Sequence, residues 1–248
     1  YGMLHGIKGL LDGQYVDLSE HIKTTLDIDL LKRTPSSFLG SCRYKLPEIC
    51  DNKEVYEQIF AKLKELEISA FFYIGGNDSM DTIKKLSDYA ILINSDIKFM
   101  GVPKTIDNDL AITDHTPGYG SAAKFIAASL KEIIRDGLVY DYPTITIVEI
   151  MGRNAGWLTA AAALSRSDDC EGVDMIYLPE KVFDIADFME QVKKRSATGK
   201  SLVIAVSEGI KVADGRYVFE LADHVEFVDA FGHKQLAGSA KFLADKIG

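Results

Sequence analysis

The chain has 248 residues, of which 47% are hydrophobic and 26% are charged, and its formal net charge is −9. This acidic balance, with no block of Lys or Arg, argues against nucleic acid or an anionic membrane as the main partner. No apolar run reaches the ~18 residues that a membrane span needs.

Three scattered cysteines, Cys42, Cys50 and Cys170, lack the spacing of metal ligands. We therefore expect reduced thiols in a cytoplasmic protein. The length permits one or two domains.

The first third of the chain predicts turns followed by a polar helical stretch at Ser19–Lys32. A loop over Pro35–Tyr44 is rich in Ser and Gly and carries Arg43. Such a loop lets the backbone approach an anion, and Arg43 could clamp phosphate oxygens. A solvated loop arginine is the alternative.

A helix at Asn52–Leu66 then precedes a strand at Ile68–Ile74, whose apolar residues on both faces are typical of a buried parallel strand. Gly75-Gly-Asn-Asp-Ser79 follows, and a helix runs on to about Leu92. The start of this helix offers N–H groups and a positive dipole end to phosphate. Helix capping by Asp78 or Ser79 is the alternative interpretation.

The next strand ends near Met100, and Pro103 keeps it from continuing as a paired strand. Lys104-Thr-Ile-Asp-Asn-Asp109 comes directly after it. Two Asp residues at this spacing can divide the work of phosphoryl transfer, one holding Mg²⁺ and one accepting a proton. A polar turn that only ends the strand is the alternative.

The second half repeats the alternation of strand and helix, which predicts an α/β fold with parallel sheets and right-handed crossovers. Two further segments directly follow predicted strands: Met151-Gly-Arg-Asn-Ala-Gly-Trp157 and Ser207-Glu-Gly209. We call these two segments, together with Gly75–Ser79 and Lys104–Asp109, the strand tips. The expected elements are helices at 121–135, 158–164, 185–195 and 234–246, strands at 144–150, 175–178 and 201–206, and a hairpin or irregular segment at 210–228.

In this order, the four strand tips resemble those of the phosphofructokinases, over nearly the whole chain from about Gly6. The resemblance is closest to the pyrophosphate-dependent branch. Its marks are an acidic residue after Gly-Gly-Asx (Asp78), a Lys before Thr-Ile-Asp-Asn-Asp (Lys104), and the run Phe231-Gly-His-Lys-Gln-Leu236.

The resemblance implies two Rossmann-like lobes, a donor lobe over 1–117 and a sugar lobe over 118–248. It also implies reversible phosphoryl transfer from pyrophosphate to the 1-hydroxyl of fructose 6-phosphate in glycolysis, with Mg²⁺. The partners would be these small molecules and further copies of the chain, as a cytoplasmic dimer or tetramer.

The family's roles carry over to matching residues. Asp107 would be the general base, and Lys104 and Arg43 would neutralise the phosphoryl group. The sugar-phosphate site would use Thr105, Met151, Gly152, Arg153 and Glu208, and the donor site Gly75, Gly76, Asp78 and Ser79. Asn77 and Asp109 would hold Mg²⁺, although position 77 is Asp in many members.

Two other functions fit the same residues: an ATP-dependent kinase of this family, and a non-catalytic subunit that binds sugar phosphate. Asp78 and Lys104 argue against the first, and the retained Asp107 against the second. The family's first strand and Gly-rich phosphate loop would precede Tyr1, so the chain is expected to be the middle of a longer enzyme.

Overall fold

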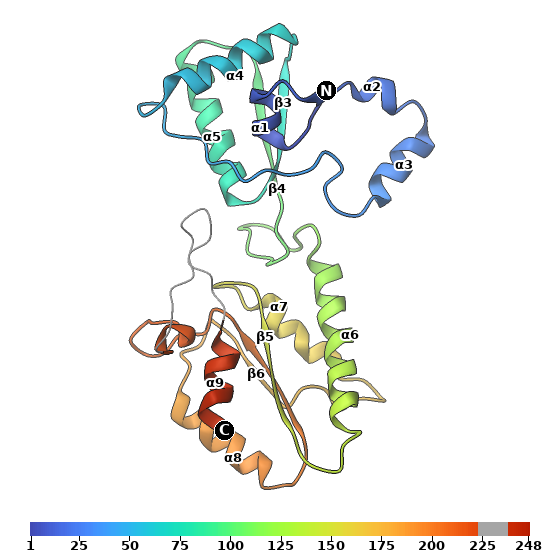
Figure 1. Ribbon diagram of the computed structural model, residues 1–248, viewed down its shortest axis with the longest axis vertical. Helices are drawn as coiled ribbons and strands as arrows, with labels where there is room; N and C mark the ends of the chain where they lie inside the picture. Colours follow the sequence, from blue (N-terminus) through green and yellow to red (C-terminus); the bar gives the residue numbers. More distant parts are fainter. Residues whose placement is uncertain (223–237) are drawn as a thin grey trace. The chain divides into compact units, whose positions relative to one another are not determined.

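The computed structural model describes residues 1–222 and 238–248. The chain divides into two compact units, Tyr1–Pro103 and Lys104–Gly248 (Figure 1). The segment 104–117, which the resemblance assigns to the donor lobe, groups here with the second unit.

The first unit is built on two parallel strands, β3 (Ala70–Gly75) and β4 (Lys98–Pro103), paired from Ala70↔Lys98 to Gly75↔Pro103. The strand expected to end near Met100 extends to Pro103, which is the last paired residue because it has no N–H to extend a ladder. Two helices, α4 (Lys53–Glu65) and α5 (Asn77–Leu92), bury their apolar stripes in the core of this unit.

The sheet of the first unit is buried on one face only, which corrects the expectation of two buried faces. Phe71 belongs to the core, whereas Phe72, Ile74 and Met100 are 65%, 66% and 56% exposed. In the part of the chain described, α4 and α5 leave the other face uncovered.

The N-terminal region is more broken than the sequence indicates. A two-stranded antiparallel pair, β1 (Gly2–Met3) and β2 (Tyr15–Val16), encloses α1 (Gly6–Leu11). The helical stretch expected at Ser19–Lys32 is two helices, α2 (Leu18–His21) and α3 (Thr25–Arg33). The break follows from capping, because the Thr24 hydroxyl accepts a hydrogen bond from Asp27 N and starts a new helix.

The second unit confirms the α/β prediction with a parallel sheet in the order β5-β7-β6. Its strands are β5 (Ile145–Ile150), β6 (Met175–Tyr177) and β7 (Leu202–Ser207). Every residue of the central strand β7 is buried, with alternate side chains reaching two different cores.

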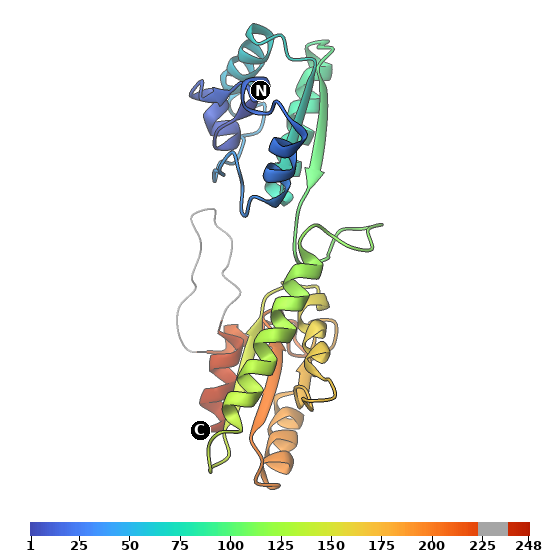
Figure 2. The ribbon, with the colours of Figure 1, turned by 90° about the vertical axis from the view of Figure 1, so that its right-hand side faces the viewer.

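Helices cover both faces of this sheet (Figure 2). On one face lie α6 (Tyr119–Gly137), α7 (Trp157–Ala160) and the 3₁₀ helix η1 (Ala161–Ser165), and on the other α8 (Ile185–Ser196) and α9 (Ser239–Ile247). The expected hairpin appears at Asp214-Gly215, where Val212 N donates to Arg216 O at 3.0 Å, and it leads to η2 (Val218–Leu221).

Two features of the sequence lie outside the described residues: the run Phe231–Leu236 and the start of the helix expected from residue 234. In the part of the chain that the structure describes, no helix combines the length and apolar character needed to cross a membrane.

Candidate active site

The segment after β4 folds into a tight polar turn. The Thr105 hydroxyl accepts a hydrogen bond from Asp107 N at 3.0 Å. Asn108 then has a φ of 59°, a left-handed conformation that Asn adopts more readily than most residues. This turn sets Asp107 and Asp109 on either side of a buried Asn108, and Lys104 and Asp109 are exposed.

Asp107 is a half-buried carboxylate without a full set of hydrogen bonds. Its Oδ1 is buried and has no hydrogen-bond partner within the described structure. Burial, followed by the nearby carboxylates of Asp109 and Glu208, raises the pKa of Asp107 above its ordinary value. The Arg153 guanidinium and the Thr105 hydroxyl oppose this rise in part. An ionised, unsatisfied oxygen of this kind is suited to accept a proton.

The tips of β5 and β7 meet because these strands are parallel and Ile150 pairs with Ser207. Glu208 Oε1 accepts hydrogen bonds from Gly152 N at 3.0 Å and from Arg153 N at 2.8 Å. One strand tip therefore holds the other in place through a carboxylate.

Gly209 makes this junction possible. A Cβ on Gly209 would lie 1.5 Å from the Arg153 carbonyl oxygen, a distance that no side chain tolerates. Arg153 itself has a φ of 51°, so the chain turns sharply there. The second unit thus brings Asp107, Asp109, Arg153 and Glu208 within electrostatic reach of one another, with Met151 exposed beside them.

In the first unit, the tip of β3 runs directly into α5. Gly76 is the N-cap residue, and Asn77 and Asp78 are exposed in the first turn of the helix. A Cβ on Gly75 would lie 2.0 Å from Ser79 Oγ, so glycine is required for Ser79 to pack there. The N-terminus of this 16-residue helix is exposed, and binding of the donor's phosphates there stays a prediction.

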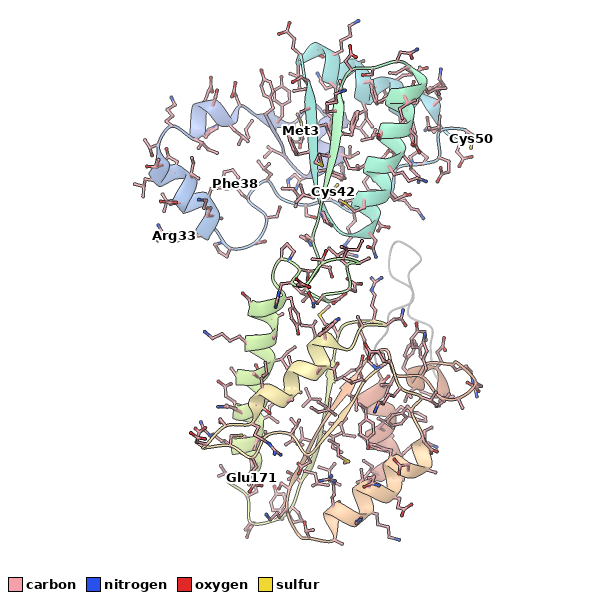
Figure 3. The ribbon with its side chains drawn as sticks, turned by 180° about the vertical axis from the view of Figure 1, so that it is seen from behind. Met3, Arg33, Phe38, Cys42, Cys50 and Glu171 are labelled. Atoms are coloured by element: carbon pink, nitrogen blue, oxygen red, sulfur yellow. The ribbon has the colours of Figure 1, made fainter. Side chains whose placement is uncertain are left out.

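Arg43 lies in an irregular loop of the same unit, as predicted, and its side chain is exposed. A cavity of about 370 Å³ is lined by this loop together with Lys8 and Asp12 of the α1 region. Cys42, labelled in Figure 3, is next to Arg43. A Cβ added on Gly6 would lie 3.4 Å from the Cys42 thiol and 3.3 Å from the Tyr73 hydroxyl of β3, so both groups lie close to Gly6.

The comparisons with known proteins agree with these motifs. The family model described as Phosphofructokinase matches residues 1–247. The chain belongs to the phosphofructokinase family.

Two curated relatives are named pyrophosphate--fructose 6-phosphate 1-phosphotransferase. The one from Rhodospirillum rubrum is 42% identical over 100% of this chain, and the one from Xanthomonas campestris is 41% identical over 98% of it. A crystal structure of a pyrophosphate-dependent phosphofructokinase from Marinobacter aquaeolei matches 99% of the chain at 33% identity with a TM-score of 0.76. The chain spans 59% and 57% of those relatives and 55% of that structure's chain.

The residues expected to hold Mg²⁺ in this phosphofructokinase chain lie in different units, Asn77 in the first and Asp109 in the second. Among residues 1–222 and 238–248, no three His, Cys, Asp or Glu side chains gather as a metal site. Proteins often hold Mg²⁺ by one or two carboxylates together with phosphate oxygens of the substrate. The carboxylate of Asp109 and the amide of Asn77 are each exposed, and their oxygens are of the kind that Mg²⁺ prefers.

The sequence pattern does not mark Gly209 or Asn108 as residues that position the site. Gly209 stands in a predicted strand tip, but its role comes from its close approach to Arg153, which no local pattern indicates. Asn108 had a signal, since it is a polar residue fixed between two predicted functional carboxylates.

Proposed function

We propose that the protein, at its full natural length, is a pyrophosphate-dependent 6-phosphofructokinase. It would move a phosphoryl group from pyrophosphate to the 1-hydroxyl of fructose 6-phosphate, reversibly. The observation that carries this proposal is the unsatisfied carboxylate of Asp107 beside Arg153 and Glu208, at strand tips whose motifs match this family. The names of the relatives at 42% and 41% identity support the choice of substrate and donor.

Each side chain has a defined task in this reaction. Asp107 Oδ1 accepts the proton of the 1-hydroxyl as the hydroxyl oxygen attacks one phosphorus of pyrophosphate. The bridging P–O bond of pyrophosphate then breaks, and phosphate leaves. Lys104 and Arg43 neutralise charge that develops on the transferred group, which is the main requirement of phosphoryl transfer. Thr105 bonds the sugar phosphate or the transferred group.

The tip of β5 binds the sugar phosphate. The Arg153 guanidinium contacts the phosphate group of the substrate, and Met151 and Gly152 lie along the sugar ring. Glu208 already uses Oε1 to hold the backbone of Gly152 and Arg153, so Oε2 is its oxygen for a sugar hydroxyl.

The donor's phosphates would bind at the start of α5, at Gly75, Gly76 and Ser79. The family resemblance assigns Mg²⁺ to Asp109 and Asn77, and the ion would neutralise charge on the donor's phosphates.

The choice of pyrophosphate over ATP rests on two residues, Asp78 and Lys104. An exposed carboxylate at Asp78 adds bulk and charge where a nucleotide's α-phosphate would pass. The Lys104 ammonium is a compact charge suited to a small, highly charged donor.

A donor assay tests the proposal. We expect the wild-type enzyme to give a higher kcat/KM with pyrophosphate than with ATP. Asp78→Gly and Lys104→Gly should each lower this preference, and the double variant should lower it further. Exposed Lys84→Gly on α5 serves as a control for the loss of a lysine outside the turn. A wild-type preference for ATP would reject the donor assignment, and inactivity with both donors would favour a non-catalytic subunit.

The resemblance also predicts a cytoplasmic homo-oligomer, a dimer or tetramer. Light scattering on the purified protein would measure its mass in solution and decide between these assemblies and a monomer.

A further inference from the structure

Asn108 differs from the two aspartates that flank it. It is 6% exposed, whereas Asp107 is half-buried and Asp109 is exposed. Within residues 104–118, Asn108 and Thr116 are the two buried residues. The segment between them is mostly exposed, and Ile112 has no core to pack against. Apolar burial therefore does little to fix the shape of this segment.

The Asn108 amide joins the two ends of the segment. Its Oδ1 accepts a hydrogen bond from Thr116 N at 2.9 Å, and its Nδ2 donates to Asp114 O at 3.2 Å. Thr116 O in turn accepts from Tyr119 N at 3.1 Å, and Tyr119 is the first residue of α6. A single buried side chain thus connects the Asp107 turn to a 19-residue helix.

The chemistry of position 108 calls for an amide. A carboxylate could still accept from Thr116 N, but it would have no hydrogen for Asp114 O. It would also place a third negative charge beside Asp107 and Asp109. Glycine would keep the left-handed backbone and lose both side-chain hydrogen bonds.

We propose that Asn108 is the positioning residue for the general base, fixing Asp107 by tying its turn to the start of α6. The inference rests on the proposed function, because it needs Asp107 to accept the substrate's proton. Asn108 is buried and both polar atoms of its amide bond to the backbone, so it would act on the rate through geometry. A misplacement of about 1 Å can cost on the order of 10²-fold in rate.

The test compares Asn108→Gly with Asn94→Gly in the protein at its full natural length. Asn94 has a φ of 51° and is exposed at the end of α5, so it matches Asn108 in residue type and backbone but lies outside the turn. We expect Asn108→Gly to lower kcat by about 10²-fold with little change in KM, and Asn94→Gly to change neither. Hydrogen exchange should show faster exchange of the Thr116 amide in Asn108→Gly only.

Asn108→Asp keeps the shape of the side chain and an acceptor for Thr116 N, but it has no hydrogen to donate to Asp114 O. We expect kcat to fall with little change in KM, a split that a general loss of stability would not produce. If Asn108→Gly fails to fold, this near-isosteric variant still tests the inference, and an unchanged kcat in it would overturn the inference.

Three outcomes are separable. A wild-type enzyme without activity on fructose 6-phosphate would defeat the proposed function, and the inference with it, whatever the exchange data show. An active wild type with an equally active Asn108→Gly would overturn the inference alone. Unchanged exchange at Thr116 in Asn108→Gly would also overturn it, because the anchor would then not depend on Asn108.

Discussion

At the scale of single residues, Asp107 is held where its ionised form is disfavoured. Its folded-state pKa is raised above the ordinary value of 3.8 by burial and by neighbouring carboxylates. A raised carboxylate pKa means that ionisation costs stability at pH values above the folded pKa, and that this cost is absent below the unfolded value. The ionised form of Asp107 that the proposed reaction needs is therefore the form that lowers the stability of the fold.

Asp107→Asn should separate the two effects. We expect kcat to fall by roughly 10²–10⁴-fold, as for loss of a general base. The unfolding temperature at pH 7 should rise, and the gain should shrink as the pH falls through the folded pKa of Asp107 toward 3.8. Asp88→Asn, an exposed site on α5, controls for the change in net charge. Near-normal turnover in Asp107→Asn would remove Asp107 from the mechanism.

Gly209 gives the second prediction at this scale. Gly209→Ala places a methyl group 1.5 Å from the Arg153 carbonyl oxygen, so one of the two strand tips must move. We expect a loss of about 1–3 kcal/mol or more in the free energy of unfolding. Urea titration measures this loss.

The matched control for that variant is Gly120→Ala. Gly120 lies in α6 with nothing within 4 Å of an added Cβ. Replacing glycine by alanine in a helix should stabilise by up to about 1 kcal/mol. Equal stabilities of the two variants would mean that the strand tips are not in close contact.

At the scale of elements, α5 holds the segment that directly follows the Arg43 loop. Lys85 of α5 is buried, and its Nζ donates to Leu46 O at 3.1 Å and pairs with Glu48 and Asp81, each at 2.8 Å. Hydrogen bonds to Asp81 and Glu48 raise the pKa of Lys85 well above 10.5. The contribution of Lys85 to stability is therefore complete below its unfolded pKa and is lost only as the pH rises through its folded value.

Lys85→Met should lower the free energy of unfolding by about 1–3 kcal/mol, the range for a lost buried hydrogen-bonding partner. It should also raise the KM for pyrophosphate, because the segment that follows Arg43 loses its anchor. Lys84→Met, an exposed neighbour on the same helix, should change neither quantity. An unchanged KM in Lys85→Met would show that the Arg43 loop is fixed by other contacts.

At the scale of the whole molecule, each unit has its own hydrophobic core. One cluster of buried residues lies in the first unit, and two lie on opposite faces of the sheet in the second. Units with separate cores need not unfold together.

Calorimetry on the variants above tests this independence. Gly209→Ala should lower the transition of the second unit, and Lys85→Met that of the first. One transition that both variants shift equally would show instead that the units unfold as one.

The sequence by itself determined most of the elements and the family. The β4 strand ends at Pro103, α5 begins after the glycine pair, and parallel strands alternate with helices, because these features depend on local rules of hydrogen bonding and apolar periodicity. The positions of the site residues at strand tips followed from the same rules, as did the resemblance carried by the motifs.

Only the tertiary structure decided which tips meet and what holds them. The Glu208 bonds to Gly152 and Arg153 join residues more than 50 positions apart, and the unsatisfied Asp107 oxygen depends on burial by several segments. The exposed face at Phe72 likewise depends on which elements cover the sheet. Local patterns encode whether a segment can form a strand or helix, whereas burial and long-range hydrogen bonds arise only when distant segments pack together.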